Sequence, residues 1–288
     1  MENNTQNIQW FPGHMTKAIR GMQKFLPLVD AVVEICDARV PMGSRNPELS
    51  KIIAGKPHIL LVNKCDLADK AANELWANEF RKCGQAAVFI DARTGSGVNK
   101  FAPAVKELLR EKTEQLKAKG MGGKPLRIMV AGIPNVGKSS FINKVAPSAA
   151  ATVADRPGVT RGNQWFRVDA GLELLDTPGV LPPKFNDMYV GELLAFTGAV
   201  RDTVVDVEDL GYKLCALLAD KYPNAIRERF GVEIDGETID IFEAIGRKRG
   251  KIVRGGEVDY ERTAVMLLDE FRGGKLGRIT LQFPNEEK

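Results

Sequence analysis

Short apolar runs alternate with amphipathic segments through the first 180 or so residues of the chain. Runs of strand length, with mainly apolar residues, lie at 30–36, 59–62, 88–90, 126–131 and 172–175. Apolar residues recur at helical spacing in the segments 16–25, 70–84, 101–119 and 140–145. Residues 164–168 pair with 172–175 as a predicted hairpin around Asp169-Ala-Gly171. Strands that alternate with helices favour a mostly parallel sheet wrapped by helices, which is an α/β fold.

The pattern changes after Leu181-Pro-Pro-Lys184. Beyond this point only helical spacing recurs, in the segments 187–198, 207–221, 238–249 and 260–273. We therefore expect three parts: a leader over 1–25, an α/β domain over 26–184 and a smaller all-helical domain over 185–288. Within the α/β domain, Gly120–Pro125 is a Gly-rich linker that leads into the predicted strand at 126–131.

The segment Gly132-Ile-Pro-Asn-Val-Gly-Lys138-Ser139 has the spacing of a phosphate-binding P-loop. A predicted strand ends directly before it and a predicted helix follows, which is the context that this motif requires. Glycines let the backbone fold around phosphate oxygens with its N–H groups pointing inward. Lys138 can reach the β- and γ-phosphates, and the Ser139 hydroxyl can bind Mg²⁺. A chance match to a Gly-rich turn would lack the flanking elements.

Two further strands end in residues suited to reading a guanine base. Asn63-Lys-Cys-Asp66 follows the strand at 59–62, and the Asp66 carboxylate can accept hydrogen bonds from guanine N1–H and N2–H₂. Adenine lacks that donor pair, so Asp66 would select GTP over ATP. Asp91-Ala92 follows the strand at 88–90 and is similar to a Ser-Ala element whose backbone contacts guanine, with Asp91 in place of serine.

The strand at 172–175 leads into Asp176-Thr-Pro-Gly179. Asp176 can hold Mg²⁺ and the Gly179 amide can face the γ-phosphate. Pro157-Gly-Val-Thr160 is similar to a switch segment whose threonine closes over Mg²⁺, although Pro157-Gly158 alone would also make a turn. The residues expected to contact the nucleotide are Asn63, Lys64, Cys65, Asp66, Asp91, Ala92, Asn135, Val136, Gly137, Lys138, Ser139, Ser140 and Gly179; those expected to bind Mg²⁺ are Ser139, Thr160 and Asp176.

The order of these motifs is permuted, because Asn63–Asp66 precedes the P-loop by roughly seventy residues. Nearly the whole chain resembles the circularly permuted ribosome-assembly GTPases. The resemblance rests on this order of motifs, the leader Gln9-Trp-Phe-Pro-Gly-His14, the strand ending in Asp37-Ala-Arg39 and the run Asp155–Thr160 followed by Gln164-Trp165. The resemblance implies a permuted P-loop GTPase domain followed by a helical RNA- and ribosome-binding domain. It also implies a cytoplasmic enzyme that acts late in maturation of the large (50S) ribosomal subunit, which stimulates its turnover.

Val180 occupies the position where many GTPases carry a glutamine that orients the attacking water. Valine cannot form such a hydrogen bond, so another group must position the water. His14 is a candidate from its chemistry, although a surface histidine beside an aromatic anchor is the simpler interpretation. The resemblance assigns His14 the catalytic role. It also matches Asn135 to an asparagine that helps to hold K⁺ beside the phosphates. His58 begins a strand and is expected to be structural.

Charge adds a candidate RNA surface. The net charge of +4 is too small to indicate nucleic acid, but residues 246–254 hold five basic side chains and no acid, and residues 106–127 hold seven against three. Either cluster is also typical of a solvated helix end. The resemblance favours rRNA for the first cluster, which consists of Arg247, Lys248, Arg249, Lys251 and Arg254. The four cysteines form no Cys-x-x-Cys pair and predict reduced thiols.

The sequence thus predicts a monomeric GTPase that binds GTP and GDP, Mg²⁺ and the large subunit with its rRNA. No apolar run reaches the ~18–20 residues of a membrane span. Two alternatives stay open. The protein could be an RNA-docking clamp with negligible turnover, since Val180 makes intrinsic hydrolysis slow. An ATPase is disfavoured by Asp66.

Overall fold

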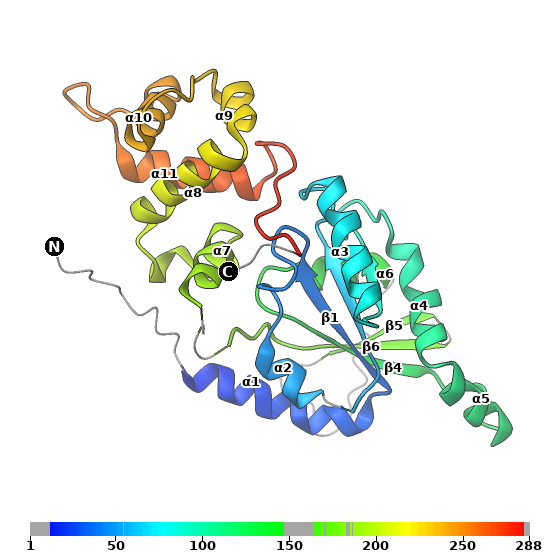
Figure 1. Cartoon of the computed structure of the whole chain (residues 1–288). Helices are drawn as coiled ribbons and strands as arrows, with labels where there is room; N and C mark the ends of the chain where they lie inside the picture. Colours follow the sequence, from blue (N-terminus) through cyan, green and yellow to red (C-terminus); the bar gives the residue numbers. More distant parts are fainter. Residues whose placement is uncertain are drawn as a thin grey trace. The chain divides into compact units, whose positions relative to one another are not determined.

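The computed structural model describes residues 12–53, 55–146, 164–169, 171–182, 185 and 187–284, with only the backbone described for 12–15. The described residues divide into two compact units. One unit comprises residues 12–182 together with 282–284, and the other comprises residues 185–281. Figure 1 labels the elements of both units, and each unit is described separately below.

A six-stranded sheet forms the centre of the first unit, in the spatial order β3-β2-β1-β4-β6-β5. All neighbours pair in parallel except β5, which is antiparallel to β6 at the edge. The strands are β1 (Ala31–Asp37), β2 (His58–Asn63), β3 (Ala87–Phe89), β4 (Leu126–Ala131), β5 (Trp165–Asp169) and β6 (Leu172–Asp176). The expected α/β sheet is therefore confirmed, and the P-loop strand β4 lies between β1 and β6.

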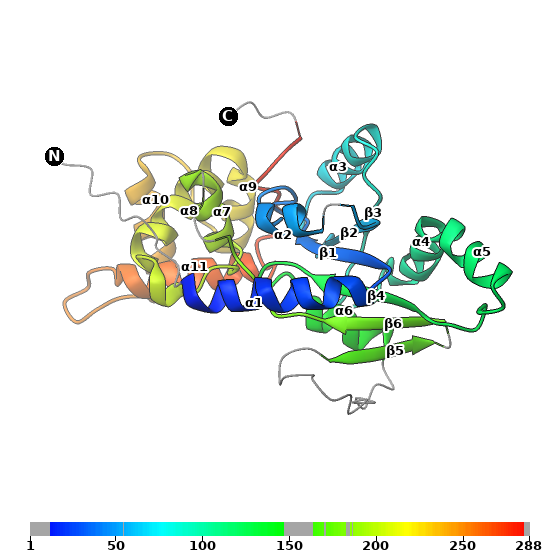
Figure 2. The ribbon, with the colours of Figure 1, turned by 90° about the horizontal axis from the view of Figure 1, so that it is seen from below.

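Helices cover both faces of this sheet (Figures 1 and 2). On one face lie α1 (Pro12–Phe25), α2 (Pro47–Ile52) and α3 (Lys70–Lys82), whose apolar side chains pack on the even-numbered residues of β1 and β2. The other helices are α4 (Phe101–Leu108), α5 (Arg110–Ala118) and α6 (Lys138–Val145), with 3₁₀ turns at Leu26–Leu28 and Val98–Lys100. Phe101 of α4 and Phe141 of α6 meet edge to face, with ring centroids 4.9 Å apart.

The helix expected over 101–119 is interrupted at Leu109, which has φ −108° and ψ 20° and separates α4 from α5. The Thr113 hydroxyl donates to the carbonyl of Leu109, and such a bond to the residue four before it bends a helix. Helix α2 was not predicted, although Asn46 and Pro47 form a good N-cap and first helical position. The leader helix begins at Pro12, earlier than expected.

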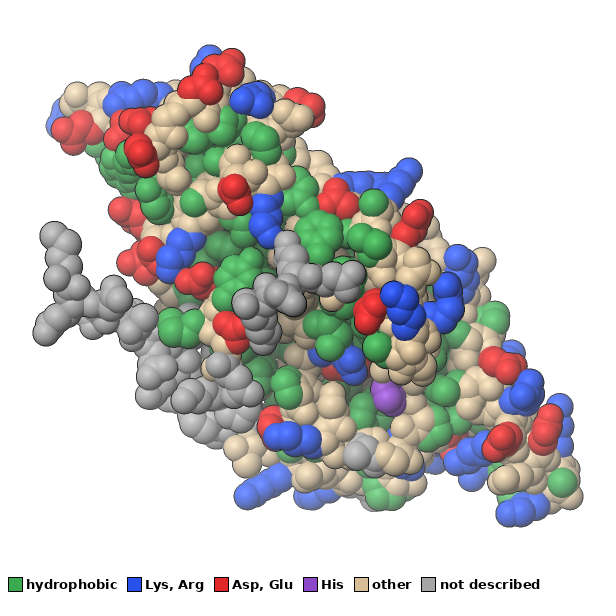
Figure 3. Space-filling model, in the orientation of Figure 1, with side chains coloured by type: hydrophobic (Ala, Val, Ile, Leu, Met, Phe, Trp, Pro, Cys, Tyr) green, Lys and Arg blue, Asp and Glu red, His purple; other side chains and the backbone are tan. Residues whose placement is uncertain are grey.

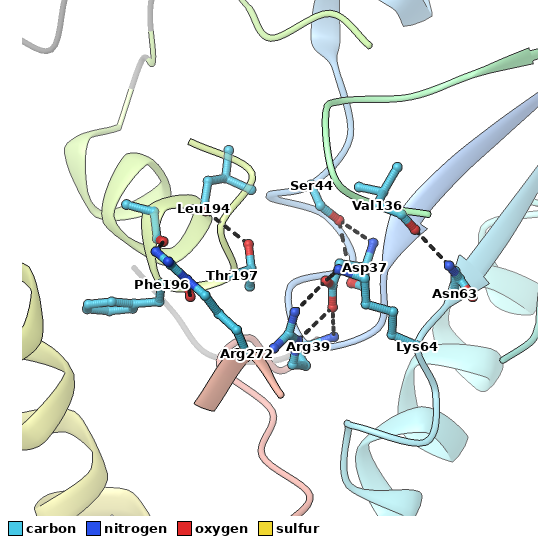
Figure 4. Close-up of polar contacts among 11 residues, drawn as sticks. Asp37, Arg39, Ser44, Asn63, Lys64, Val136, Leu194, Phe196, Thr197 and Arg272 are labelled. Carbon is cyan, nitrogen blue, oxygen red and sulfur yellow. Dashed lines mark hydrogen bonds and ion pairs between the residues drawn. The ribbon is translucent and has the colours of Figure 1, made fainter. Parts of the chain in front are cut away.

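The second unit is entirely helical among its described residues. Its elements are α7 (Met188–Phe196), a 3₁₀ turn (Asp202–Val204), α8 (Val207–Lys221), α9 (Pro223–Phe230), α10 (Thr238–Lys248) and α11 (Tyr260–Arg272). Helices α8 and α11 approach closely, since a Cβ at Gly211 would lie 2.4 Å from the Cβ of Ala264. Arg272 closes the end of α7 by donating to the carbonyls of Ala195 and Phe196 (Figure 4). Helix α9 was not predicted.

The end of the helical domain differs from the sequence expectation, whereas the state of the cysteines agrees with it. The helical domain was expected to reach residue 288, whereas Gln282 belongs to the nucleotide-binding unit. Its side-chain oxygen accepts hydrogen bonds from the amides of Met42 and Gly43, which draws the tail back to that unit. All four cysteines are free thiols, as expected. Among the described residues, no helix combines the length and apolar character that crossing a membrane requires.

Candidate functional site

The P-loop connects β4 to α6 and depends on glycine at two positions. Gly132 has φ 149° and Gly137 has φ 98°, values that other residues rarely adopt. A Cβ on Gly137 would lie 2.2 Å from Nδ2 of Asn63, and one on Gly132 would lie 2.5 Å from the carbonyl oxygen of Ile35. These glycines are therefore required both by conformation and by the close approach of neighbouring strands.

Asn63 joins three of the predicted motifs. Its Nδ2 donates to the carbonyl of Val136 in the P-loop over 2.7 Å, and its Oδ1 accepts from the amide of Ala92 over 2.9 Å. Figure 4 shows the first of these bonds at the end of β2. Because the side chain is only 3% exposed, both bonds are shielded from water. The residue predicted to serve the base thus also fixes the two loops beside it.

The loop after β3, which lies next to the guanine-reading loop, carries a second acid, Asp91. Its carboxylate accepts hydrogen bonds from the amides of Arg93 and Thr94 and from the Thr94 hydroxyl. Burial opposes ionisation, but these hydrogen bonds outweigh it and lower the pKa of Asp91. These hydrogen bonds to the Asp91 carboxylate stabilise the turn after β3. Arg93 also reaches Asp66, with 3.3 Å between the guanidinium and the carboxylate.

Lys138 and Asp176 lie close to each other at the phosphate side of the site. Burial lowers the pKa of Lys138 to about 8, against the opposing effect of Asp176, and the Lys138 ammonium donates to the carbonyls of Gly132 and Ile133. Burial also raises the pKa of Asp176, although Lys138 counteracts it. The Asp176 Oδ1 atom is buried without a hydrogen-bond partner among the described residues. A buried carboxylate oxygen of this kind suits a cation.

Gly179 and Val180 approach the P-loop from β6. A Cβ on Gly179 would lie 2.9 Å from both the Lys138 ammonium and the amide nitrogen of Pro134. The amide of Val180 donates to the carbonyl of Gly132 over 3.3 Å. The Val180 side chain is 3% exposed and packs in the apolar core with Met22 of α1. The segment after Asp176 is thus held against the lysine of the P-loop.

A buried ion cluster supports the guanine-reading loop, and sequence reasoning missed its role. Asp37, at the end of β1, pairs with Arg39 over 2.8 Å and with Lys64 over 2.9 Å (Figure 4). Burial by itself would raise the pKa of Asp37, but the two cations hold it well below its usual range. Lys64 has a left-handed φ of 62°, which this pairing helps to maintain. The available signal was Asp37-Ala-Arg39 directly after a buried strand.

The other predicted nucleotide and metal residues lie at exposed or half-buried positions, or outside the described residues. Ser139 and Ser140 are exposed in the first turn of α6, and Asn135 is exposed in the P-loop with φ 60°. Cys65 follows Lys64 in the guanine-reading loop and is half-buried. Thr160 lies outside the described residues. His14 lies in α1, one turn before Ala18, and its side chain lies outside the described residues.

The predicted rRNA residues belong to the other unit, at the end of α10 and in the loop after it. Arg249 pairs with Glu270, donates to the carbonyl of Arg229 and lies 5.0 Å from the centre of the Phe230 ring. Arg247 pairs with Glu243. No ion pair of Lys248, Lys251 or Arg254 is found within the described part of the chain. On the face drawn in Figure 3, acidic and basic side chains are intermingled over α4 and α5.

Comparison with known proteins identifies the family. A family model described as "50S ribosome-binding GTPase" matches residues 127–233. Ribosome biogenesis GTPase A of Bacillus cereus is 44% identical over 97% of this chain and 95% of its own length, and that of Priestia megaterium is 45% identical over 97% and 98%. A crystal structure of GNP-bound YlqF from T. maritima superposes with a TM-score of 0.65 at 25% identity, over 94% of this chain and 100% of that one.

A GDP-bound structure of the same T. maritima protein gives a TM-score of 0.64 at 25% identity, over 93% of this chain and 100% of that one. The likeness covers both units, and the two relatives are matched over 95% and 98% of their own lengths. The P-loop, the loop Asn63–Asp66 and Asp176 lie together at the carboxyl ends of the parallel strands. This chain belongs to the ribosome biogenesis GTPase A family and is a GTPase.

Proposed function

We propose that this protein hydrolyses GTP as an assembly factor in late maturation of the large ribosomal subunit, in the cytoplasm, and that the subunit stimulates its turnover. The observation that carries this proposal is the buried Val180. Its side chain is fixed in the core and has no hydrogen-bonding group, so it cannot orient the attacking water. Turnover by the described residues alone is therefore expected to be slow, and a partner is needed to complete the site.

The packing of α1 supports His14 as the residue that positions the water. Ala18, Ile19 and Met22 of this helix pack in the same apolar cluster as Val180. Ile19 and Met22 also line a small cavity together with Gly132 of the P-loop and Val180. The helix that carries His14 thus packs against Val180, whose side chain cannot orient the attacking water. Binding to the subunit would fix the start of α1, and with it the histidine.

The described residues fit a magnesium ion. Asp176 offers a buried oxygen without a partner, and Ser139 lies in the first turn of α6. Among the described residues no three His, Cys, Asp or Glu side chains cluster, and Mg²⁺ in nucleotide sites typically takes phosphate oxygens as further ligands. Ser139, Asp176 and Thr160 would hold the ion, which would neutralise charge that develops on the phosphates. Lys138 would bind the β- and γ-phosphates, and Gly179 would contact the γ-phosphate.

A potassium ion beside the phosphates would supply further positive charge. Asn135 is the residue proposed to help hold it, because it is exposed in the P-loop next to the residues that cradle phosphate. Hydrolysis should then be faster in potassium than in sodium salts at equal ionic strength, and Asn135→Ser should reduce that difference. Equal rates in the two salts would remove this role.

The rRNA contact is proposed to involve Lys248, Lys251 and Arg254, since Arg247 and Arg249 also have partners inside the helical unit. Changing these three residues to glutamine should weaken subunit binding and flatten its salt dependence by roughly 0.7–0.9 in log–log slope for each phosphate that is no longer neutralised. The matched control changes Lys106, Lys117 and Lys124, three exposed lysines of the nucleotide-binding unit, to glutamine. An equal change in both variants would indicate a general effect of charge.

The decisive experiment measures GTP turnover with and without large subunits in the wild type, His14→Ala and the control Gln23→Ala, an exposed position on α1. We expect the subunit to raise the wild-type rate. His14→Ala should lose roughly 10²–10⁴-fold of the stimulated rate while GTP affinity stays the same. If subunits bind without raising turnover in the wild type, the protein acts as a GTP-dependent clamp instead. Full stimulation of His14→Ala would show that another group positions the water.

A further inference from the structure

The loop between β1 and α2 ends in an asparagine that contacts three separate segments. Asn46 is 2% exposed, and its amide donates to Oε1 of Glu34 in β1 over 3.1 Å. Its Oδ1 caps α2 by accepting from the amide of Glu48 over 3.0 Å. Its Nδ2 donates to the carbonyl of Val180 over 2.8 Å. Because all these polar groups are engaged, the position of the side chain is well determined.

The bond to Val180 matters because Val180 directly follows Gly179. The Val180 amide donates to the carbonyl of Gly132, and the Val180 carbonyl accepts from Asn46. The backbone of Val180 is therefore held by the P-loop at its amide and by Asn46 at its carbonyl. The direction of the Gly179 amide is set within this short segment. GTP has a γ-phosphate that can accept from that amide and GDP does not. On the nucleotide site proposed above, Asn46 would therefore act on a contact that GTP makes and GDP does not.

The loop that carries Asn46 is held in turn by the tail of the chain. Oε1 of Gln282 accepts from the amides of Met42 and Gly43, both over 2.9 Å, and the Gln282 carbonyl accepts from Nε1 of Trp76 over 2.8 Å. Two residues earlier, Thr280 is fully buried in the helical unit and exchanges two hydrogen bonds with the Tyr222 hydroxyl. The tail is thus anchored in one unit by Thr280 and in the other by Gln282.

We propose that Asn46 is a positioning residue for the Gly179–Val180 segment, and that Gln282 holds the loop of Asn46. The tail that follows the helical unit would then influence how strongly the site distinguishes GTP from GDP. Asn46 would act through its hydrogen bond to the carbonyl of Val180. The sequence separation of these two pairs explains why no motif brings them together: Asn46 and Val180 are 134 residues apart, and Met42 and Gln282 are 240 apart.

The first test uses Asn46→Ser, because serine still caps α2 but is too short to reach the carbonyl of Val180. Affinities for GDP and for a non-hydrolysable GTP analogue are measured with fluorescent nucleotides in the presence of Mg²⁺. We expect the analogue to bind about five- to tenfold more weakly, the usual effect of removing one hydrogen bond, with GDP affinity unchanged. An equal loss for both nucleotides, or no loss for either, would overturn the proposal.

The second test compares Gln282→Ala with Gln282→Glu. Alanine removes the acceptor for the Met42 and Gly43 amides, whereas glutamate keeps an oxygen there. Gln282→Ala should shift the ratio of analogue to GDP affinity in the same direction as Asn46→Ser, and Gln282→Glu should retain the wild-type ratio. Combining Asn46→Ser with Gln282→Ala should add nothing, because both act through one path.

Additive effects of the two changes, or a failure of glutamate to restore the ratio, would refute a path through Gln282. Melting temperatures of all variants establish that they are folded at the assay temperature, so a change in ratio reports on positioning and not on unfolding. Neither measurement requires a ribosomal subunit. A negative result here would therefore leave the proposed stimulation by the subunit untouched, and a failure of that stimulation would leave Asn46 unaffected.

Discussion

Asn63 donates a hydrogen bond to the carbonyl of Val136 across 73 residues of sequence, and this bond joins the guanine-reading loop to the P-loop. In a permuted chain the two motifs are connected only through two intervening helix–strand segments. The direct bond therefore links the loop predicted to read the base with the loop predicted to bind phosphate.

Asn63→Ala should therefore weaken binding of GTP and GDP alike. It leaves the carbonyl of Val136 and the amide of Ala92 without their partner, at a cost of about 1–3 kcal/mol for each buried group. Titration calorimetry with both nucleotides measures the loss, and Asn78→Ala on the exposed side of α3 is the control. A loss confined to the triphosphate would contradict a role at both loops.

Gly137→Ala should abolish nucleotide binding. The new Cβ would lie 2.2 Å from Nδ2 of Asn63, and φ at this residue is 98°. Gly120→Ala is a matched control, because Gly120 has φ 73° with no atom within 4 Å of a Cβ. The control measures how much placing alanine in a left-handed backbone lowers the free energy of unfolding, which is about 1–2 kcal/mol. Nucleotide binding by Gly137→Ala at the level of the control would mean that the P-loop can shift to make room.

Asp66→Asn should reduce selectivity for guanine. The mutant amide presents a donor where guanine also presents one, and the mismatch costs about 1–3 kcal/mol. Competition of labelled GTP with unlabelled ATP and GDP gives the selectivity. Arg93→Ala removes the exposed partner of Asp66 and should have a small effect, because solvent-exposed ion pairs contribute little. Unchanged selectivity in Asp66→Asn would mean that residues 63–66 form a turn without a role in base recognition.

Asp37→Asn should destabilise the nucleotide-binding unit by about 3–5 kcal/mol at neutral pH, because Arg39 and Lys64 lose the carboxylate that compensates them. The pKa of Asp37 lies below its unfolded value of about 3.9, so its contribution is present above that pH and is lost as the pH falls. The difference in the free energy of unfolding in urea between the two proteins should thus stay level from pH 7 down to about pH 5 and begin to shrink between about pH 4 and pH 3. A constant difference over that range would contradict the shifted pKa.

The local motifs could be predicted because each is a continuous run with its own chemistry. The spacing of Gly132–Ser139 and the strand before it predict phosphate binding, and the carboxylate of Asp66 predicts a preference for guanine over adenine. Alternation of strands and helices was enough to predict the α/β sheet, which the structure has. Helix ends were harder, since the break at Leu109 depends on the Thr113 hydroxyl and α9 is only eight residues long.

The sequence by itself predicted which residues bind a guanine nucleotide and established that the motifs occur in permuted order, because both depend on short segments. Only the tertiary structure decided how the segments support one another. The strands β1, β2, β4 and β6 pair in parallel, so their carboxyl ends lie side by side. Asp37, Asn63, the P-loop and Asp176 meet there. The pairing of Asp37 with Lys64, and the bonds of Asn46 and Gln282, join residues distant in sequence, and such interactions arise from packing that no local pattern encodes.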